Sequence, residues 1–320
     1  MQVNGQKIVV LGTGGTIAGT SAQAGDNIGY TAAQVGVAQL LGAVPGLQQA
    51  AAGAQLVTEQ VAQIDSKDMD TAVWQALAQR CAQHLQDPAV QGVVITHGTD
   101  TLEETAWFLD QVLDTHAKPV VLTCAMRPAT ALAPDGPQNL LDAVAVASTP
   151  GARGVVAVAA GELHGARQGQ KVHPYRVNAF NSGEAGPLGW VEEGRVRLEQ
   201  NWPLAQCSQA LTAIETIVNT PVWPRVEVVL NHAGASGALV DALVRDGVQG
   251  LVVACTGNGT IHHALEAALL RAQAGGVRVL RSTRCAQGQV LPKPGDALPD
   301  AHGLSPVKAR ISLMLELLQG

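Results

Sequence analysis

Four apolar runs in the N-terminal part of this chain each end at a polar turn. The runs are rich in Val and Ile and alternate with segments of helical apolar spacing, which is typical of βαβ units in a parallel sheet. The carboxyl ends of parallel strands lie along one sheet edge, where open α/β sheets bind ligands. We therefore expect the four turns to meet at one site. The predicted strands are residues 7–11, 55–61, 92–95 and 119–123.

The alternation of predicted strands and helices is interrupted in two regions of the chain, at residues 161–190 and after residue 195. Helices are predicted at 69–86, 101–114 and 137–148, and a fifth strand at 154–160. Residues 161–190, rich in Gly, Pro, His and Asn, are expected to form a long irregular segment, which in a compact domain is often functional.

The change of pattern after residue 195 predicts two domains. Residues 1–195 are expected to form an N-terminal α/β catalytic domain, 196–223 a linker with two Trp-Pro pairs, and 224–320 a smaller α/β domain. The smaller domain is predicted to hold strands at 225–231, 250–255 and 277–281 and helices at 237–245, 261–274 and 306–318.

Charge and composition limit the kinds of molecule that this protein is expected to bind. A net charge of −6 with no cluster of Lys and Arg argues against nucleic acid and favours a small-molecule substrate. No apolar run reaches membrane-spanning length, so no membrane partner is expected. We expect a cytoplasmic protein, or a periplasmic one if a leader has been removed. The five cysteines lack a C-x-x-C pair and are expected to be mostly buried free thiols.

The first turn, 12–16, displays the hydroxyl of Thr16 from a glycine-rich loop whose amides can hold an anion. Ile17 stands where a dinucleotide fingerprint needs its third glycine, and a P-loop lysine is lacking. A nucleotide-dependent oxidoreductase is therefore a weak alternative. Thr16 is either a nucleophile or a helix cap.

The second turn, 97–101, carries Thr99 and Asp100 at the start of a predicted helix. A threonine nucleophile needs a base, and a buried lysine serves better than an ordinary carboxylate. Lys67 and Lys171 are the candidates. The alternatives are that Asp100 caps the helix and that Lys171 is a solvated surface residue. His97 is a further possible base, or a structural residue.

A metal site is not expected. His262, His263 and Glu266 have helical spacing, but the H-E-x-x-H pattern is absent and the signal is weak.

Two segments resemble the signature segments of bacterial L-asparaginases. They are residues 13–19, TGGTIAG, and 95–105, ITHGTDTLEET. Residues 125–128, 135–137, 186–189 and 257–259 fit as well, so the resemblance spans nearly the whole chain. It implies a larger flavodoxin-like N-terminal domain, a smaller parallel-sheet α/β domain, and a homotetramer.

The resemblance also implies residue roles. Thr16 matches the nucleophile and Tyr30 the phenol that helps to activate it. Thr99, Asp100 and Lys171 match a second catalytic triad. The positions matching the substrate-binding residues are Gly15, Ser66, Lys67, Thr99, Asp100 and Ala125.

Within that set, Ser66 is expected to bind the substrate α-carboxylate and Asp100 its α-ammonium. The Thr99 amide matches an oxyanion donor, and the Ala125 carbonyl a group near the departing nitrogen.

Three positions depart from the family pattern. Lys67 stands where relatives often have Gln, and either attracts the carboxylate or points to solvent. Gly234 replaces an Asn that some relatives supply from a neighbouring subunit. Residues 286–305 hold no Glu to reach the ammonium, and Asp296 and Asp300 are the acidic residues available there. Weaker binding of the ammonium is the resulting hypothesis.

The sequence therefore predicts a cofactor-free amidohydrolase that converts L-asparagine to L-aspartate and ammonia through an acyl-enzyme on a threonine. A broader glutaminase-asparaginase is the first alternative, since a single methylene is discriminated weakly. A non-catalytic amino-acid-binding protein of the same fold is the second.

Overall fold

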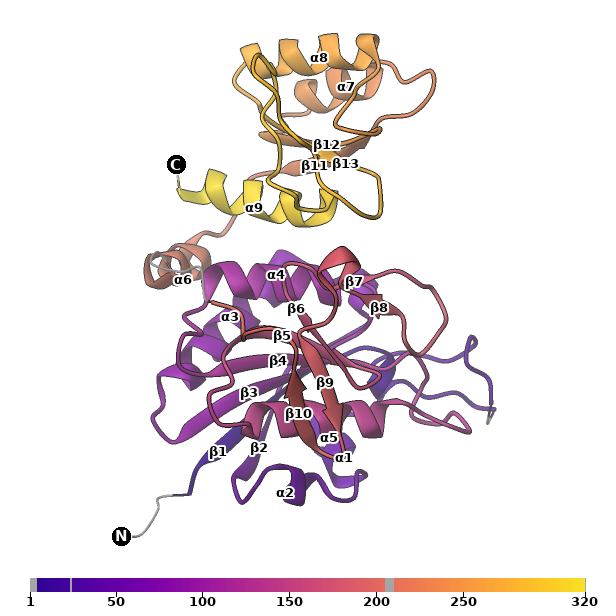
Figure 1. The fold of residues 1–320 in the computed structure, drawn as a ribbon, viewed down its shortest axis with the longest axis vertical. Helices are drawn as coiled ribbons and strands as arrows, with labels where there is room; N and C mark the ends of the chain where they lie inside the picture. The colour runs from indigo at the N-terminus through magenta and orange to yellow at the C-terminus, as the bar shows by residue number, and fades with distance from the viewer. Residues whose placement is uncertain (1–4, 24, 205–209, 320) are drawn as a thin grey trace. The chain divides into compact units, whose positions relative to one another are not determined.

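The structure is a computed structural model that describes residues 5–23, 25–204 and 210–319, except for the side chains of 210–213 (Figure 1). It divides into two compact units, Met1–Val218 and Asn219–Gly320. The sequence-based boundaries at 195 and 224 stay a prediction. Within the predicted linker, residues 205–209, including Cys207, lie outside the described part.

The larger unit is built on one mixed sheet with the strand order β10-β9-β6-β5-β4-β3-β1-β2. Strands β1 to β5 are parallel in the order 2-1-3-4-5, which is the flavodoxin order, as predicted. The remaining three strands extend the sheet in antiparallel fashion. The strands are β1 (Lys7–Gly14), β2 (Gln55–Ile64), β3 (Val90–Thr96), β4 (Pro119–Thr123), β5 (Gly154–Ala159), β6 (Glu162–Gly165), β9 (Gly189–Glu192) and β10 (Arg195–Leu198).

Helices cover both faces of this sheet (Figure 1). Helices α3 (Thr71–Gln86) and α4 (Leu102–Val112) pack together on one face, and α5 (Gly136–Ser148) lies on the other with α1 (Val37–Gly42) and α2 (Leu47–Ala50). Helix α6 (Ala210–Asn219) belongs to this unit up to Val218. Asp70 begins α3 by accepting the Val73 N–H at 2.9 Å, a cap that leaves one fewer helix donor unpaired.

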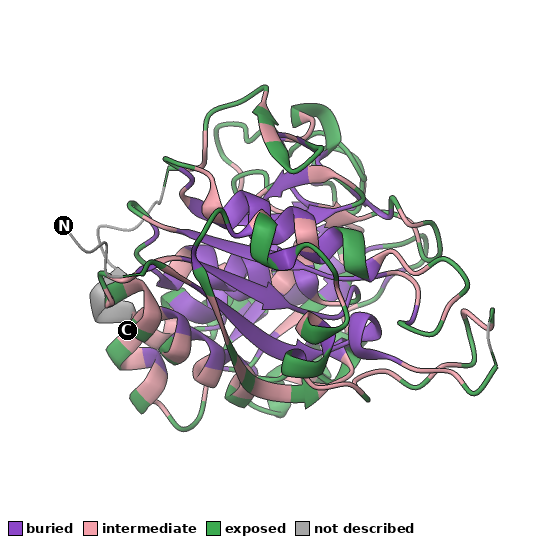
Figure 2. Ribbon diagram, turned by 90° about the horizontal axis from the view of Figure 1, so that it is seen from below, coloured by how far each residue is buried: buried purple, intermediate pink, exposed green. Residues whose placement is uncertain are grey.

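The core lies between the sheet and these helices, where the strands of Figure 2 are coloured as buried. Val10, Val94 and Val121 have no exposed surface and pack in one cluster with Leu140 and Val144 of α5. Each such side chain stabilises the fold by about 1.5–3 kcal/mol through burial. This rigid centre carries the turns that follow β1 to β4.

The segment 161–190 is more regular than the sequence predicted. It contains β6, β7 (Gln170–Lys171), β8 (Phe180–Asn181) and the start of β9, and β10 follows within the predicted linker. These strands have two to four residues each. Such short runs are below the length at which alternation of apolar residues is recognisable.

The smaller unit has a three-stranded parallel sheet in the order β11-β12-β13, as the sequence predicted. Helices α7 and α8 pack together, and α9 packs on the strands (Figure 1). The elements are β11 (Val226–Leu230), α7 (Ala238–Arg245), β12 (Gly250–Cys255), α8 (His263–Ala274), β13 (Arg278–Thr283) and α9 (Pro306–Gln319). In the described part of the chain, no helix has the length and apolar character needed to span a membrane.

Candidate active site

The turns after β1, β2 and β3 touch one another through glycine backbone. Gly15 has φ 81°, and a Cβ on it would lie 2.4 Å from the Gly98 Cα. A Cβ on Gly98 would lie 2.4 Å from the Ser66 Oγ. Only glycine allows approaches this close. The larger unit therefore brings the residues around 15, 66 and 98 together at the carboxyl edge of its sheet.

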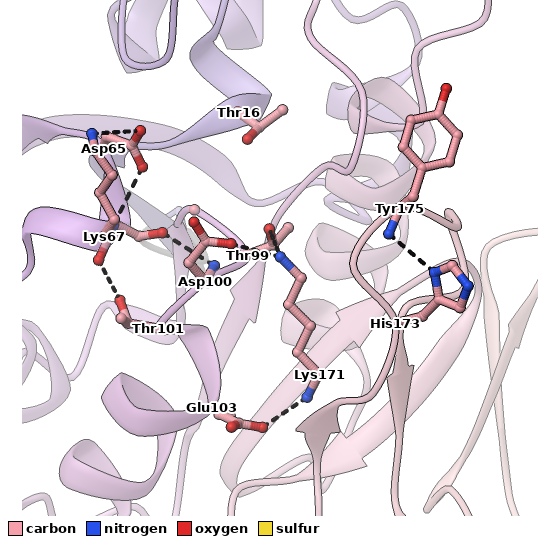
Figure 3. Close-up of polar contacts among 12 residues, drawn as sticks. Thr16, Asp65, Lys67, Thr99, Asp100, Thr101, Glu103, Lys171, His173 and Tyr175 are labelled. Carbon is pink, nitrogen blue, oxygen red and sulfur yellow. Dashed lines mark hydrogen bonds and ion pairs between the residues drawn. The ribbon is translucent and has the colours of Figure 1, made fainter. Parts of the chain in front are cut away.

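Lys171 reaches this meeting point from β7 (Figure 3). Its Nζ donates to the Thr99 Oγ1 at 2.8 Å and to the Asp100 Oδ1 at 2.6 Å. Its side chain is only 18% exposed, so Lys171 is not a solvated surface residue. The Glu103 Oε2 accepts the Lys171 backbone N–H at 2.7 Å and so fixes β7 against α4.

Asp100 does not cap α4. The N-cap position is Thr101, whose hydroxyl donates to the Ser66 carbonyl at 2.8 Å instead of accepting from the helix. The carboxylate of Asp100 is therefore available to Lys171, and half of its side chain is exposed to solvent.

Thr16 is buried with its hydroxyl 2.7 Å from the Tyr30 phenol oxygen. Tyr30 is brought back to the first turn by two backbone hydrogen bonds, both of 2.9 Å, between Thr20 and Thr31. The short helix Thr16–Ala18 begins after Gly15 without a side-chain cap. Thr16 is thus not a capping residue, and its hydroxyl is paired with a second hydroxyl.

The turn after β2 places Ser66 and Lys67 differently. The Ser66 Oγ is buried and accepts the Asp100 N–H at 3.2 Å, which leaves the Ser66 O–H free to donate to an anion. The Lys67 Nζ pairs with Asp65 at 3.0 Å and Asp68 at 3.1 Å on an exposed side chain. These carboxylates raise the pKa of Lys67. The structure therefore favours the solvent-facing alternative for Lys67.

The turn after β4 is held by two residues to which the sequence assigned no role. The Asp135 carboxylate accepts the N–H groups of Met126 at 2.9 Å and Arg127 at 3.0 Å. The Asn139 Nδ2 donates to the Cys124 carbonyl at 2.9 Å. Ala125 lies between these contacts and is fully buried. Asp135 was visible in the sequence within its Asp-Gly-Pro motif, whereas nothing there marked Asn139.

His97 faces away from solvent. Its Nδ1 lies 2.7 Å from the Gly98 carbonyl oxygen and its Nε2 lies 2.9 Å from the Thr105 hydroxyl. Complete burial lowers the pKa of His97 to about 4. Both ring nitrogens are engaged by the protein, so the structural alternative applies and His97 is not a base beside Thr99.

In the smaller unit, the acidic residues of 286–305 are engaged locally. Asp296 pairs with the buried Arg281 at 2.7 Å, and the Asp300 carboxylate accepts the His302 N–H at 2.8 Å. His262 caps α8 by accepting the Ala264 N–H at 3.2 Å. Across the described residues, no three His, Cys, Asp or Glu side chains gather as a metal site would require.

The geometry of the larger unit supports nucleophilic chemistry. A hydroxyl can attack a carbonyl if a neighbouring group relays its proton, and an ammonium beside a second hydroxyl can exchange protons with that hydroxyl. Thr16 with Tyr30 and Thr99 with Lys171 are two such pairs, and the close approach of Gly15 to Gly98 brings their turns together.

Comparison with known proteins identifies the family of this chain. Residues 7–204 match the family model "Asparaginase, N-terminal", and residues 225–320 match "Glutaminase/Asparaginase C-terminal domain". A glutaminase-asparaginase of Pseudomonas fluorescens is 37% identical, over 97% of this chain and 86% of its own.

Two further relatives are similar over almost the full length. A probable periplasmic L-asparaginase of Haemophilus influenzae is 36% identical, over 98% of this chain and 88% of its own. The crystal structure of a probable cytoplasmic L-asparaginase from Campylobacter jejuni superposes with a TM-score of 0.89 at 36% identity, covering 98% of this chain and 96% of that one. Matched in both its domains and along nearly all its length, the chain belongs to the asparaginase family.

Proposed function

We propose that this protein is an L-asparaginase, an amidohydrolase that converts L-asparagine to L-aspartate and ammonia. The observation that carries the proposal is the contact of the Lys171 Nζ with both Thr99 and Asp100, next to the turn that holds Thr16. Family membership and the relatives named L-asparaginase support the same activity.

In the proposed mechanism the Thr16 Oγ attacks the side-chain amide carbon while its proton is relayed through Tyr30, whose phenol takes the Thr16 proton and gives up its own toward the amide nitrogen. The C–N bond then breaks, the nitrogen takes up a proton, and ammonia leaves an ester on Thr16. A water molecule adds to this ester, its proton being relayed through Thr99 and Lys171. Cleavage of the C–O bond releases L-aspartate and restores the Thr16 hydroxyl.

Substrate binding is proposed to use the surrounding groups. The free O–H of Ser66 suits the α-carboxylate, and the exposed carboxylate of Asp100 suits the α-ammonium. The N–H of Thr99 stabilises the oxyanion, with Gly15 beside it. Ala125, held by Asp135 and Asn139, lies on the leaving-group side. Lys67 contributes no direct contact, since its ammonium is paired within its own turn.

Glutamine is proposed as a second, poorer substrate. A relative named glutaminase-asparaginase supports this breadth. One additional methylene changes transition-state binding by about 1–3 kcal/mol, so a ratio of roughly 10 to 200 between the two kcat/KM values is expected.

The assembly and the compartment are also proposals. We propose a homotetramer, and a cytoplasmic location like that named for the Campylobacter jejuni relative. The Haemophilus influenzae relative is named as periplasmic, which is the alternative.

The test is ammonia release from asparagine and glutamine, measured side by side on the purified protein. We expect Thr16→Ala and Thr99→Ala each to abolish turnover, and Lys171→Met to lower kcat by about 10²–10⁴-fold, the usual worth of positioned proton transfer. Circular dichroism should show all three variants folded. Full activity in both alanine variants would contradict the proposed roles of these threonines.

Two controls address the rival functions. Thr115→Val removes a buried hydroxyl that has no hydrogen-bond partner among the described residues, so its kcat should be unchanged. L-Aspartate should raise the melting temperature and NAD should not. Binding of L-aspartate without any turnover by the wild type would instead indicate a non-catalytic amino-acid-binding protein.

A further inference from the structure

A chain of hydrogen bonds runs from α3 to the turn after β3 through buried side chains. The Trp74 Nε1 donates to the Thr105 Oγ1 at 2.9 Å, and the Thr105 Oγ1 lies 2.9 Å from the His97 Nε2. The His97 Nδ1 then lies 2.7 Å from the Gly98 carbonyl oxygen. All three side chains are at most 5% exposed, so water does not compete for these bonds.

The direction of every bond in this chain follows from its end groups. The indole N–H of Trp74 can only donate, and the Gly98 carbonyl can only accept. The His97 Nδ1 therefore carries a proton, because two acceptors would otherwise face each other at 2.7 Å. Burial keeps the ring neutral, so the Nε2 is unprotonated and accepts the proton of the Thr105 hydroxyl.

The last acceptor belongs to the peptide unit that the proposed reaction uses. The Gly98 carbonyl and the Thr99 N–H share one amide, whose resonance couples the oxygen to the nitrogen. A donor at the oxygen makes the N–H more positive, and bonds aligned in one direction reinforce one another. Among the residues that the structure describes, no protein acceptor takes the Thr99 N–H, so it is available to a developing oxyanion.

We propose that Trp74, Thr105 and His97 are positioning residues that fix and polarise the Gly98–Thr99 peptide, so that the Thr99 N–H stabilises the oxyanion of the transition state. The inference rests on the proposed amidohydrolase function. Its donors come from α3, α4 and the end of β3, and none of the three residues touches the reacting atoms. This chain of hydrogen bonds should therefore affect kcat and leave the binding of the substrate in its ground state unchanged.

The central experiment compares Thr105→Val with Thr105→Ser and with Thr115→Val. Valine keeps the shape but breaks the chain, and we expect kcat for asparagine to fall roughly tenfold, a fraction of the 10²–10³-fold worth of a whole oxyanion donor. KM and the affinity for L-aspartate should stay within about twofold. Serine restores the hydroxyl and should recover kcat, whereas the Thr115→Val control should match the wild type.

A second measurement, by NMR, tests the chain of hydrogen bonds independently of catalysis. The ¹⁵N shifts of His97 should show a protonated Nδ1 and a bare Nε2 in the wild type. Labelling with ¹³C′-glycine and ¹⁵N-threonine selects the five Gly–Thr pairs of the sequence, and Thr99→Ser identifies the signal of Thr99. Its amide proton should move upfield in Thr105→Val and stay in place in Thr115→Val.

Three results would overturn the inference: an Nε2-protonated His97, an unchanged Thr99 amide shift with unchanged kcat in Thr105→Val, or equal losses in the valine and serine variants. If Thr105→Val does not fold, two other measurements test the inference: the tautomer of His97 in the wild type, and the kcat of Trp74→Phe, which removes the first donor and keeps an aromatic ring. A wild type that binds L-aspartate but releases no ammonia would contradict the proposed function, while the tautomer and the amide shift would still test the chain.

Discussion

At the scale of single residues, the role that a lysine can take in this site depends on the carboxylates around its ammonium group. The ammonium of Lys171 lies between a hydroxyl and one carboxylate, whereas that of Lys67 lies between two carboxylates of its own turn. An ammonium that is held by two anions and is largely exposed adds little to the binding of a third. The sequence offered both lysines as candidate bases. Their surroundings favour Lys171 over Lys67 for a role in the site.

Lys67→Gln tests this difference. We expect KM for asparagine to stay within about twofold of the wild type and kcat to be unchanged, because exposed ion pairs of this kind contribute only about 0–1 kcal/mol. Steady-state kinetics at low and high salt would measure both constants. A tenfold rise in KM would instead place the Lys67 ammonium on the substrate carboxylate.

His97 makes the stability of the fold dependent on pH. Burial lowers its pKa from 6.5 to about 4 in the folded state, so between these values the unfolded state binds more protons. Stability is therefore fully present above pH 6.5 and falls as the pH drops toward 4. The slope is about 1.4 kcal/mol per pH unit for one such group.

Urea unfolding of the wild type and His97→Gln at pH 7.5, 6 and 5 measures this contribution. The free energy of unfolding of the variant should depend less steeply on pH, whatever its absolute value. Parallel curves for the two proteins would mean that folding does not lower the pKa of His97.

At the scale of elements, the site depends on how closely the turns after β1 and β3 approach. Gly15→Ala would place a Cβ against the Gly98 backbone at a position with φ 81°. Gly53→Ala is a control at another positive φ, 88°, where no atom lies within 4 Å of the added Cβ. The backbone strain of a non-glycine residue at such a position costs about 1–3 kcal/mol.

We expect Gly15→Ala to be less stable than Gly53→Ala and to lose about 10²-fold or more in kcat, since a displacement of 1 Å is enough for such a loss. Gly53→Ala should keep the wild-type kcat. Thermal unfolding and ammonia release measure the two effects. Equal stability and activity in the two variants would mean that the two turns can separate without consequence.

The individual strands and turns also show how much of the fold and of the candidate site the sequence predicted. Strands β1, β3 and β4 were predictable because they are buried on both faces and read as continuous apolar runs. Strands β6 to β9 were not, because they are short and lie among polar residues. Thr16, Thr99 and Lys171 were predicted as site residues from motifs and family resemblance. The support from Asn139 and Thr105 depends on contacts between distant segments, which spacing along the chain does not encode.

At the scale of the whole molecule, the smaller unit exposes an apolar strand face. Along β11, Val228 and Leu230 alternate with the buried Val229 and are 36% and 53% exposed. Strand β11 is an edge of its sheet, and an edge strand with apolar exposed side chains tends to associate. This face is a candidate contact for the proposed homotetramer.

The prediction for this scale concerns mass in solution. Light scattering should give about four times the chain mass of 33.0 kDa for the wild type. Leu230→Lys should lower this mass because an ammonium buried in an apolar contact costs several kcal/mol, whereas Gln86→Lys, which adds the same charge on the exposed end of α3, should leave it unchanged. If Leu230→Lys keeps the mass of the wild type, the β11 face is not part of the assembly. A monomeric wild type would overturn the tetramer itself, and the kinetics of the site would then belong to the single chain.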